Sequence, residues 1–126
     1  MCSKILLIED EDNVRETIDL LLTTAGYQVR ASATGKNIFE IIGDFNPDLI
    51  LLDILLDGVD GRDICRDIKA NSMTASVPVI ILSAVPEIYN AIMDVGANDI
   101  VSKPFEGSVL LSRIERQLLN AKVPKM

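Results

Sequence analysis

The chain has 126 residues, of which 48% are hydrophobic, and its formal net charge is −7. This length and apolar content suit one well-buried domain, and we expect a single unit over residues 1–126, with its core at 4–119 and a tail at 120–126. The sequence has neither an apolar run long enough to cross a bilayer nor a signal-peptide pattern, which predicts a cytoplasmic protein without membrane contact. The acidic balance argues against direct nucleic-acid binding and favours a cation as the charged partner.

Strand-like and helix-like patterns alternate along the chain. Short continuous apolar runs indicate buried strands, and apolar residues at intervals of three and four indicate helices that bury one face. In chain order the predicted elements are a strand at 4–9, a helix at 14–22, a strand at 27–31, a helix at 38–45, a strand at 49–52, a helix at 64–68, a strand at 78–83, a helix at 88–95, a strand at 100–101 and a helix at 109–119. We expect Asp12 or Asn13 to cap the first helix and Gly26 to end it, with Gly58 and Gly61 in a loop before the third helix.

Five strands alternating with five helices indicate a doubly wound α/β fold, an open parallel sheet with helices on both faces, because parallel neighbours need crossover connections. In such sheets, ligands bind beyond the carboxyl ends of the strands. These ends supply Glu9 and Asp10 from the first strand, Asp53 from the third, Ser83 from the fourth and Lys103 from the fifth. The sequence therefore predicts that three carboxylates, a hydroxyl and an ammonium group meet at one edge of the sheet.

Crowded carboxylates have a predictable chemistry. Two of them about 4 Å apart repel by roughly 4 kcal/mol at an effective dielectric constant near 20, so the site must take up a proton or hold a cation. Mg²⁺, or Mn²⁺ in its place, suits Asp10 and Asp53 as direct ligands, with Glu9 bound directly or through water. Asp53 lies centrally and is the candidate nucleophile for phosphoryl transfer, while Lys103 and Ser83 would contact the phosphoryl oxygens.

Six short motifs extend this pattern over the chain. They are Ile8-Glu9-Asp10-Glu11, Leu51-Leu52-Asp53, Asp60-Gly61, Val79-Ile80-Ile81-Leu82-Ser83-Ala84, Gly96-Ala97-Asn98-Asp99 and Lys103-Pro104-Phe105. In this order and at this spacing, the chain resembles the receiver domains of bacterial two-component response regulators, including the chemotaxis-regulator type. The resemblance covers essentially the whole chain, from Lys4 to about Leu119.

The resemblance implies a flavodoxin-like (βα)5 fold with strand order 2-1-3-4-5. It also implies a signalling phospho-acceptor, which catalyses only its own phosphorylation and dephosphorylation. The expected phosphoryl donor is a histidine kinase or a histidine phosphotransfer protein, and the expected target is a downstream effector protein. Because the chain has no histidine, it is not itself the donor. We expect a monomer or a weak dimer.

The resemblance further assigns a role to each residue of the predicted site. These roles are phosphorylation of Asp53, metal binding by Glu9, Asp10, Asp53 and the backbone carbonyl of Leu55, a switch hydroxyl on Ser83, and a charge-pairing lysine, Lys103, ahead of a cis Pro104. The acids Glu11, Asp12, Asp60 and Asp63 are interpreted as solvated or capping residues.

Three positions depart from the usual pattern of the family. Glu9 stands where aspartate is commoner, which lengthens the side chain by one methylene, and Asp57 replaces a frequent proline. Ile100 stands where many receivers carry a tyrosine or phenylalanine that turns inward on activation. A branched aliphatic side chain cannot swing a ring, so we expect the usual coupling between hydroxyl and aromatic ring to be weaker or differently routed.

Two alternatives from other functional classes stay open at this point. A hydrolase with an aspartate nucleophile also places an Asp at a strand end, but it needs a second acid two residues later, where this chain has Leu55. A receiver that serves only as a phosphorylation-independent docking module is conceivable because of Ile100. The complete set of acids, hydroxyl and lysine favours the phospho-accepting receiver.

Overall fold

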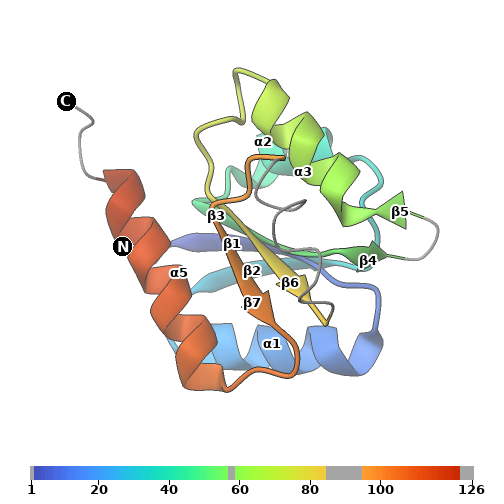
Figure 1. Cartoon of the computed structure of the whole chain (residues 1–126). Coiled ribbons are helices and arrows are strands. Elements are labelled where there is room, and N and C mark those ends of the chain that lie inside the picture. The colour runs from blue at the N-terminus through green and yellow to red at the C-terminus, as the bar shows by residue number, and fades with distance from the viewer. Residues whose placement is uncertain (1, 57–58, 85–94, 123–126) are drawn as a thin grey trace.

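The computed structural model describes residues 2–56, 59–84 and 95–122. Its main sheet has five parallel strands in the order β2-β1-β3-β6-β7 (Figure 1). Their bounds are β1 (Lys4–Ile8), β2 (Gln28–Ser32), β3 (Leu49–Asp53), β6 (Val79–Ser83) and β7 (Asp99–Ser102). Counted along the chain, this is the predicted order 2-1-3-4-5, and the doubly wound fold is confirmed.

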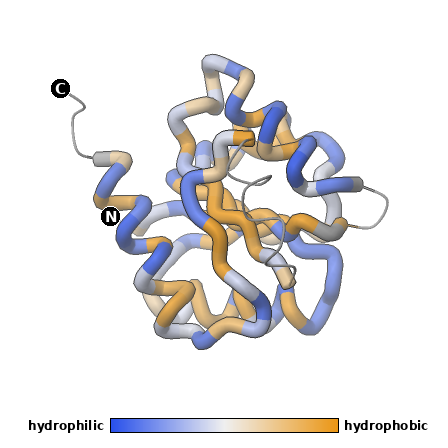
Figure 2. Tube along the Cα trace, viewed as in Figure 1, coloured by the Kyte–Doolittle hydropathy of each residue, from blue (hydrophilic) through white to orange (hydrophobic). Residues whose placement is uncertain are grey.

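The helices cover both faces of the sheet (Figure 1). They are α1 (Asp12–Thr24), α2 (Ile38–Phe45), α3 (Gly61–Ala70) and α5 (Gly107–Lys122). Buried residues of α1 and α5 pack on one face and buried residues of α2 and α3 on the other, which gives two hydrophobic clusters separated by the sheet. Figure 2 shows hydrophobic residues concentrated in the strands, as expected for a sheet buried on both sides. The predicted helix at 88–95 lies outside the described residues, except for its last residue.

Strand register brings the carboxyl ends of the strands to one edge. Ile8 of β1 pairs with Ser32 of β2 and with Leu52 of β3, so Asp53 and Glu9 leave neighbouring strands at the same level. Asp53 in turn pairs with Leu82, one residue before the end of β6. This alignment is what assembles the site.

Two local predictions were wrong. The N-cap of α1 is Glu11, without a side-chain capping bond, because Asp12 and Asn13 already lie within the helix. Residues after Asp53 form a short antiparallel hairpin of β4 (Leu55–Leu56) and β5 (Val59–Asp60) where a loop was expected. Gly26 does end α1, with a φ of 99° that favours glycine. Among the described helices, none is long and apolar enough to cross a membrane.

Candidate functional site

Three carboxylates meet at the carboxyl edge of the sheet. Glu9 and Asp10 follow β1, Asp53 ends β3, and each offers an oxygen within 4.8 Å of the other two. Glu9 is 1% exposed and Asp53 6% exposed, whereas Asp10 is partly exposed. The structure thus brings together the three acids that the sequence placed at neighbouring strand ends. A set of oxygen donors with one accessible member fits a hard divalent cation.

Lys103 lies within this acidic cluster. Its Nζ donates to Glu9 Oε2 at 3.0 Å and to Asp53 Oδ2 at 3.1 Å, and its backbone N–H donates to the carbonyl of Ser83 at 2.8 Å. Burial acts to lower the pKa of Lys103, but the hydrogen bonds to Glu9 and Asp53 outweigh burial and raise it above its usual 10.5. Lys103 is therefore an ammonium ion at any physiological pH. The peptide bond between Lys103 and Pro104 is cis, as the resemblance implied.

The cluster holds more negative charge than one lysine neutralises. Burial, followed by hydrogen bonding with Asp53, raises the pKa of Glu9 from 4.5 to about 7, although hydrogen bonding with Lys103 acts in the opposite direction. Without a metal ion, Glu9 is therefore partly protonated near neutral pH. This agrees with the expectation that such a site either takes up a proton or holds a cation.

For the other predicted site residues, the structure gives a position but does not test the predicted role. Ser83 ends β6 at the same edge and is 2% exposed. Leu55 pairs with Asp60 in the hairpin, and the use of its carbonyl as a metal ligand stays a prediction. Ile100 is half-buried against the cluster beneath α2 and α3. Asp57 lies outside the described residues.

Arg15 supports the site but was not predicted from the sequence. Its guanidinium donates to the backbone carbonyl of Glu9 at 3.0 Å and also bonds the Asp12 carboxylate. Arg15 thereby ties α1 to the turn that carries Glu9 and Asp10. The Asp12 and Arg15 spacing of three residues signals a helical ion pair, but such a pair does not by itself reveal the contact with Glu9.

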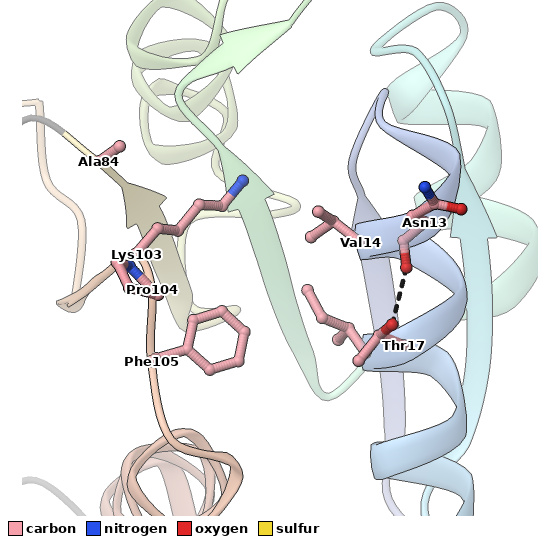
Figure 3. A pocket seen from close by; sticks show the side chains of 8 residues that line it. Asn13, Val14, Thr17, Ala84, Lys103, Pro104 and Phe105 are labelled. Atoms are coloured by element: carbon pink, nitrogen blue, oxygen red, sulfur yellow. Dashed lines mark hydrogen bonds between the residues drawn. The ribbon is translucent and has the colours of Figure 1, made fainter.

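A cleft of about 480 Å³ adjoins the acidic cluster (Figure 3). Asn13, Val14 and Thr17 of α1 line one side, and Lys103, Pro104 and Phe105 line the other. Lys103 lines the cleft and also donates a hydrogen bond to Asp53, so the cleft and the acidic cluster adjoin at this residue. Its remaining lining residues, Ile18 and Ala84, are apolar.

Residues 5–115 match the response regulator receiver domain. The chain belongs to this family. Over 116 residues it is 38% identical to the transcriptional regulatory protein AfsQ1 of Streptomyces coelicolor. The matched region covers 90% of this chain and 50% of AfsQ1. The chain therefore spans about half the length of AfsQ1.

Two solved structures show the same fold over nearly their whole length. A putative response regulator from Chloroflexus aurantiacus is 34% identical, with a TM-score of 0.88 and coverage of 94% of this chain and 99% of that chain. The receiver domain of the sensor histidine kinase PA1611 from Pseudomonas aeruginosa is 29% identical, with a TM-score of 0.84 and coverage of 94% and 98%, and it holds a magnesium ion in its active-site cleft.

The receiver-domain interpretation of the sequence is thus confirmed. A receiver domain is a signalling phospho-acceptor rather than a catalyst, and the pocket formed by Glu9, Asp10 and Asp53 is consistent with magnesium-dependent phosphorylation of an aspartate.

Proposed function

We propose that Asp53 is the phospho-accepting residue and that a histidine kinase or histidine phosphotransfer protein is its donor. The observation that carries this proposal is the position of Asp53, whose carboxylate lies among two other acids and accepts a hydrogen bond from Lys103. Asp53 is also the central member of the cluster, since β3 lies between β1 and β6 in the sheet.

In the proposed reaction, a carboxylate oxygen of Asp53 attacks phosphorus and forms the P–O bond of an acyl phosphate. The P–N bond to the donor imidazole breaks, and its electron pair stays on the imidazole nitrogen, which takes up a proton. Lys103 pairs with one phosphoryl oxygen, and the hydroxyl of Ser83 donates a hydrogen bond to another. These contacts stabilise the charge that the transferred group brings to the site.

Asp10 and Asp53 would hold Mg²⁺ or Mn²⁺, with Glu9 close by and the carbonyl of Leu55 as a further oxygen donor. The bound ion supplies positive charge that neutralises phosphoryl oxygens during transfer. The accessible Asp10 carboxylate and the buried Asp53 carboxylate support this assignment.

Incubation with acetyl phosphate and MgCl₂, followed by intact mass measurement, tests this function. We expect the parent protein to gain the mass of one phosphoryl group and the Asp53→Asn variant to gain none, because an amide is not a competent nucleophile. Labelling of Asp53→Asn at the parent's rate would place the site elsewhere. Steady phosphate release without a mass gain would indicate a hydrolase, and neither signal would indicate a phosphorylation-independent docking module.

A further inference from the structure

Arg15 holds the backbone on both sides of Asp10. Its guanidinium donates from Nη1 to the carbonyl of Glu9 at 3.0 Å, and its backbone N–H donates to the carbonyl of Glu11 at 2.9 Å. Because a peptide group is planar, fixing the carbonyl of Glu9 also fixes the bond that leads to the Cα atom of Asp10. The turn after β1 is thereby held in the form in which it presents the Asp10 carboxylate.

The Asp10 carboxylate depends on this backbone for its position. Asp10 is partly exposed, and no residue in the described part of the chain donates a hydrogen bond to its side chain. Glu9 and Asp53, by contrast, each accept a hydrogen bond from Lys103. A side chain without such a contact is directed only through its backbone, so a turn with more conformational freedom would spread the Asp10 oxygens over many positions.

The Arg15 side chain is itself held in place. Its Nη2 donates to Asp12 Oδ1 at 2.5 Å, and the side chain is only 20% exposed, although that of Asp12 is 79% exposed. A second pair at the same spacing, Asp63 and Arg66 on α3, has both side chains at least 60% exposed. Exposed pairs of this kind contribute little. Its burial and its bond to a main-chain carbonyl therefore set Arg15 apart from an ordinary helical ion pair.

We propose that Arg15 is a positioning residue: it fixes the peptide group between Glu9 and Asp10, so that the Asp10 carboxylate is directed towards the divalent ion before the ion binds. This inference rests on the function proposed above, in which Asp10 is a metal ligand. A ligand that is already in place binds more tightly, because less conformational freedom is lost on binding. The charge of Arg15 acts in the opposite direction, since a guanidinium close to the site repels a cation. Weaker ion binding after the loss of Arg15 would therefore report position and not charge.

Titration calorimetry with MgCl₂, without any phosphoryl donor, tests this role. Arg15→Met keeps an unbranched apolar side chain but has neither charge nor donor, and we expect its dissociation constant for Mg²⁺ to rise about tenfold, the scale typical of a lost outer-shell partner. Arg66→Met removes the same charge from α3 and is the matched control, with an expected change of less than about twofold. An unchanged or lower dissociation constant in Arg15→Met would overturn the proposal, because loss of a positive charge alone favours cation binding.

A second measurement does not depend on the metal. In metal-free protein, the NMR shifts of the Glu9 carbonyl carbon and of the Asp10 amide nitrogen report on the peptide group that Arg15 contacts. We expect both shifts to change in Arg15→Met and to stay at their parental values in Arg66→Met. Parental shifts in Arg15→Met would show that the side chain does not hold this peptide group, and the proposal would fail.

Arg15→Lys takes the place of Arg15→Met if thermal unfolding shows that the methionine variant is unstable. Lysine keeps the charge, but one nitrogen cannot span the two acceptors as the two Nη atoms do, so the dissociation constant should rise several-fold. A parental value would overturn the proposal. Undiminished labelling of Asp53→Asn would refute the proposed phospho-acceptor without changing these results, whereas a parent protein that binds no Mg²⁺ would refute the metal site together with this role.

Discussion

Asp60 is not a member of the acidic cluster, but it caps the helix α3 that begins next to it. Its carboxylate caps α3 by accepting from the backbone N–H of Arg62 at 2.9 Å, and the Arg62 side chain donates to both carboxylate oxygens. The bond with the Arg62 side chain, despite the opposing effect of burial, lowers the pKa of Asp60 below its usual 3.8. Asp60 was predicted to be a capping or solvated acid, and the capping role is confirmed.

We expect Asp60→Ala to lower the free energy of unfolding by about 1 kcal/mol near neutral pH, the usual cost of a lost N-cap. Because the folded pKa lies below the unfolded pKa, the carboxylate stabilises the fold above the unfolded value and loses this effect as the pH falls through the folded value. Urea unfolding of parent and variant near pH 7 and at about pH 2 to 3 measures both. A difference in stability that stays constant over this range would contradict the charged cap.

At Ser83 we expect the loss of the hydroxyl to separate phosphorylation from switching. Ser83→Ala should still be labelled at Asp53, since the nucleophile and the neighbouring acids remain. In the parent, amide NMR shifts on beryllofluoride addition should concentrate at residues 53–60 and 83–90, with smaller shifts around Ile100. In the variant, the response at 83–90 should vanish. A parental response in Ser83→Ala, or shifts at Ile100 as large as those at 83–90, would count against this account of the switch.

At the scale of elements, the hairpin of β4 and β5 connects Asp53 to α3. The backbone N–H of Gly61, the first residue of α3, donates to the carbonyl of Ile54 at 2.7 Å. A Cβ atom at Gly61 would collide with the carbonyl oxygen of Asp53 and would lie 2.8 Å from Cα of Ile54. The start of α3 therefore fixes the backbone of Asp53, and only glycine permits this approach.

A pair of glycine substitutions tests this contact. Gly61→Ala should destabilise the protein by about 1 to 3 kcal/mol and slow acetyl phosphate labelling, because backbone atoms next to Asp53 must move. Gly43→Ala is the matched control: Gly43 lies within α2, with no atom within 4 Å of an added Cβ, so alanine should stabilise by about 0.5 to 1 kcal/mol and leave labelling unchanged. Thermal unfolding and labelling rates measure both effects. Similar stabilities for the two variants would show that the close approach at Gly61 is not required.

The elements of the sheet were more predictable than the connections between them. Continuous apolar runs identify buried strands well, because all five residues of β3 and of β6 are buried. The hairpin was predicted to be a loop, because strands of only two residues are too short to show the alternating pattern of a strand. The Asp57-Gly58 pair between Leu56 and Val59 is nevertheless a recognised hairpin signal. The hydrogen bond from Arg15 to Glu9 was missed because it depends on how α1 folds back over the preceding turn.

At the scale of the whole molecule, the site lies beside the cleft between α1 and the turn after β7 (Figure 3). A donor histidine has to reach Asp53 from solvent, and Lys103 lines the cleft while binding Asp53. We therefore expect a protein donor to cover part of this cleft, whereas acetyl phosphate is small enough not to need it.

Substitutions at Thr17 and Thr23 test whether a protein donor covers the cleft. Both are exposed on α1 and both donate their hydroxyl to the carbonyl four residues earlier, but only Thr17 lines the cleft. Thr17→Lys should slow phosphoryl transfer from a histidine phosphotransfer protein about tenfold or more, by blocking a docked surface, while Thr23→Lys transfers at the parental rate. Both variants should be labelled normally by acetyl phosphate. Equal transfer rates for the two variants would place the donor elsewhere.

The hydrogen bond between Glu9 and Lys103 joins residues 94 positions apart, so it forms only when the turns after the first and last strands of the sheet are both in place. During synthesis the chain carries all three acids long before it carries their lysine, and such distant contacts form late in folding. We expect truncated or incompletely folded copies to be poor phosphoryl acceptors for this reason. Intact copies would then receive the phosphoryl groups without competition from defective ones, which keeps the output of the donor proportional to the number of working receivers.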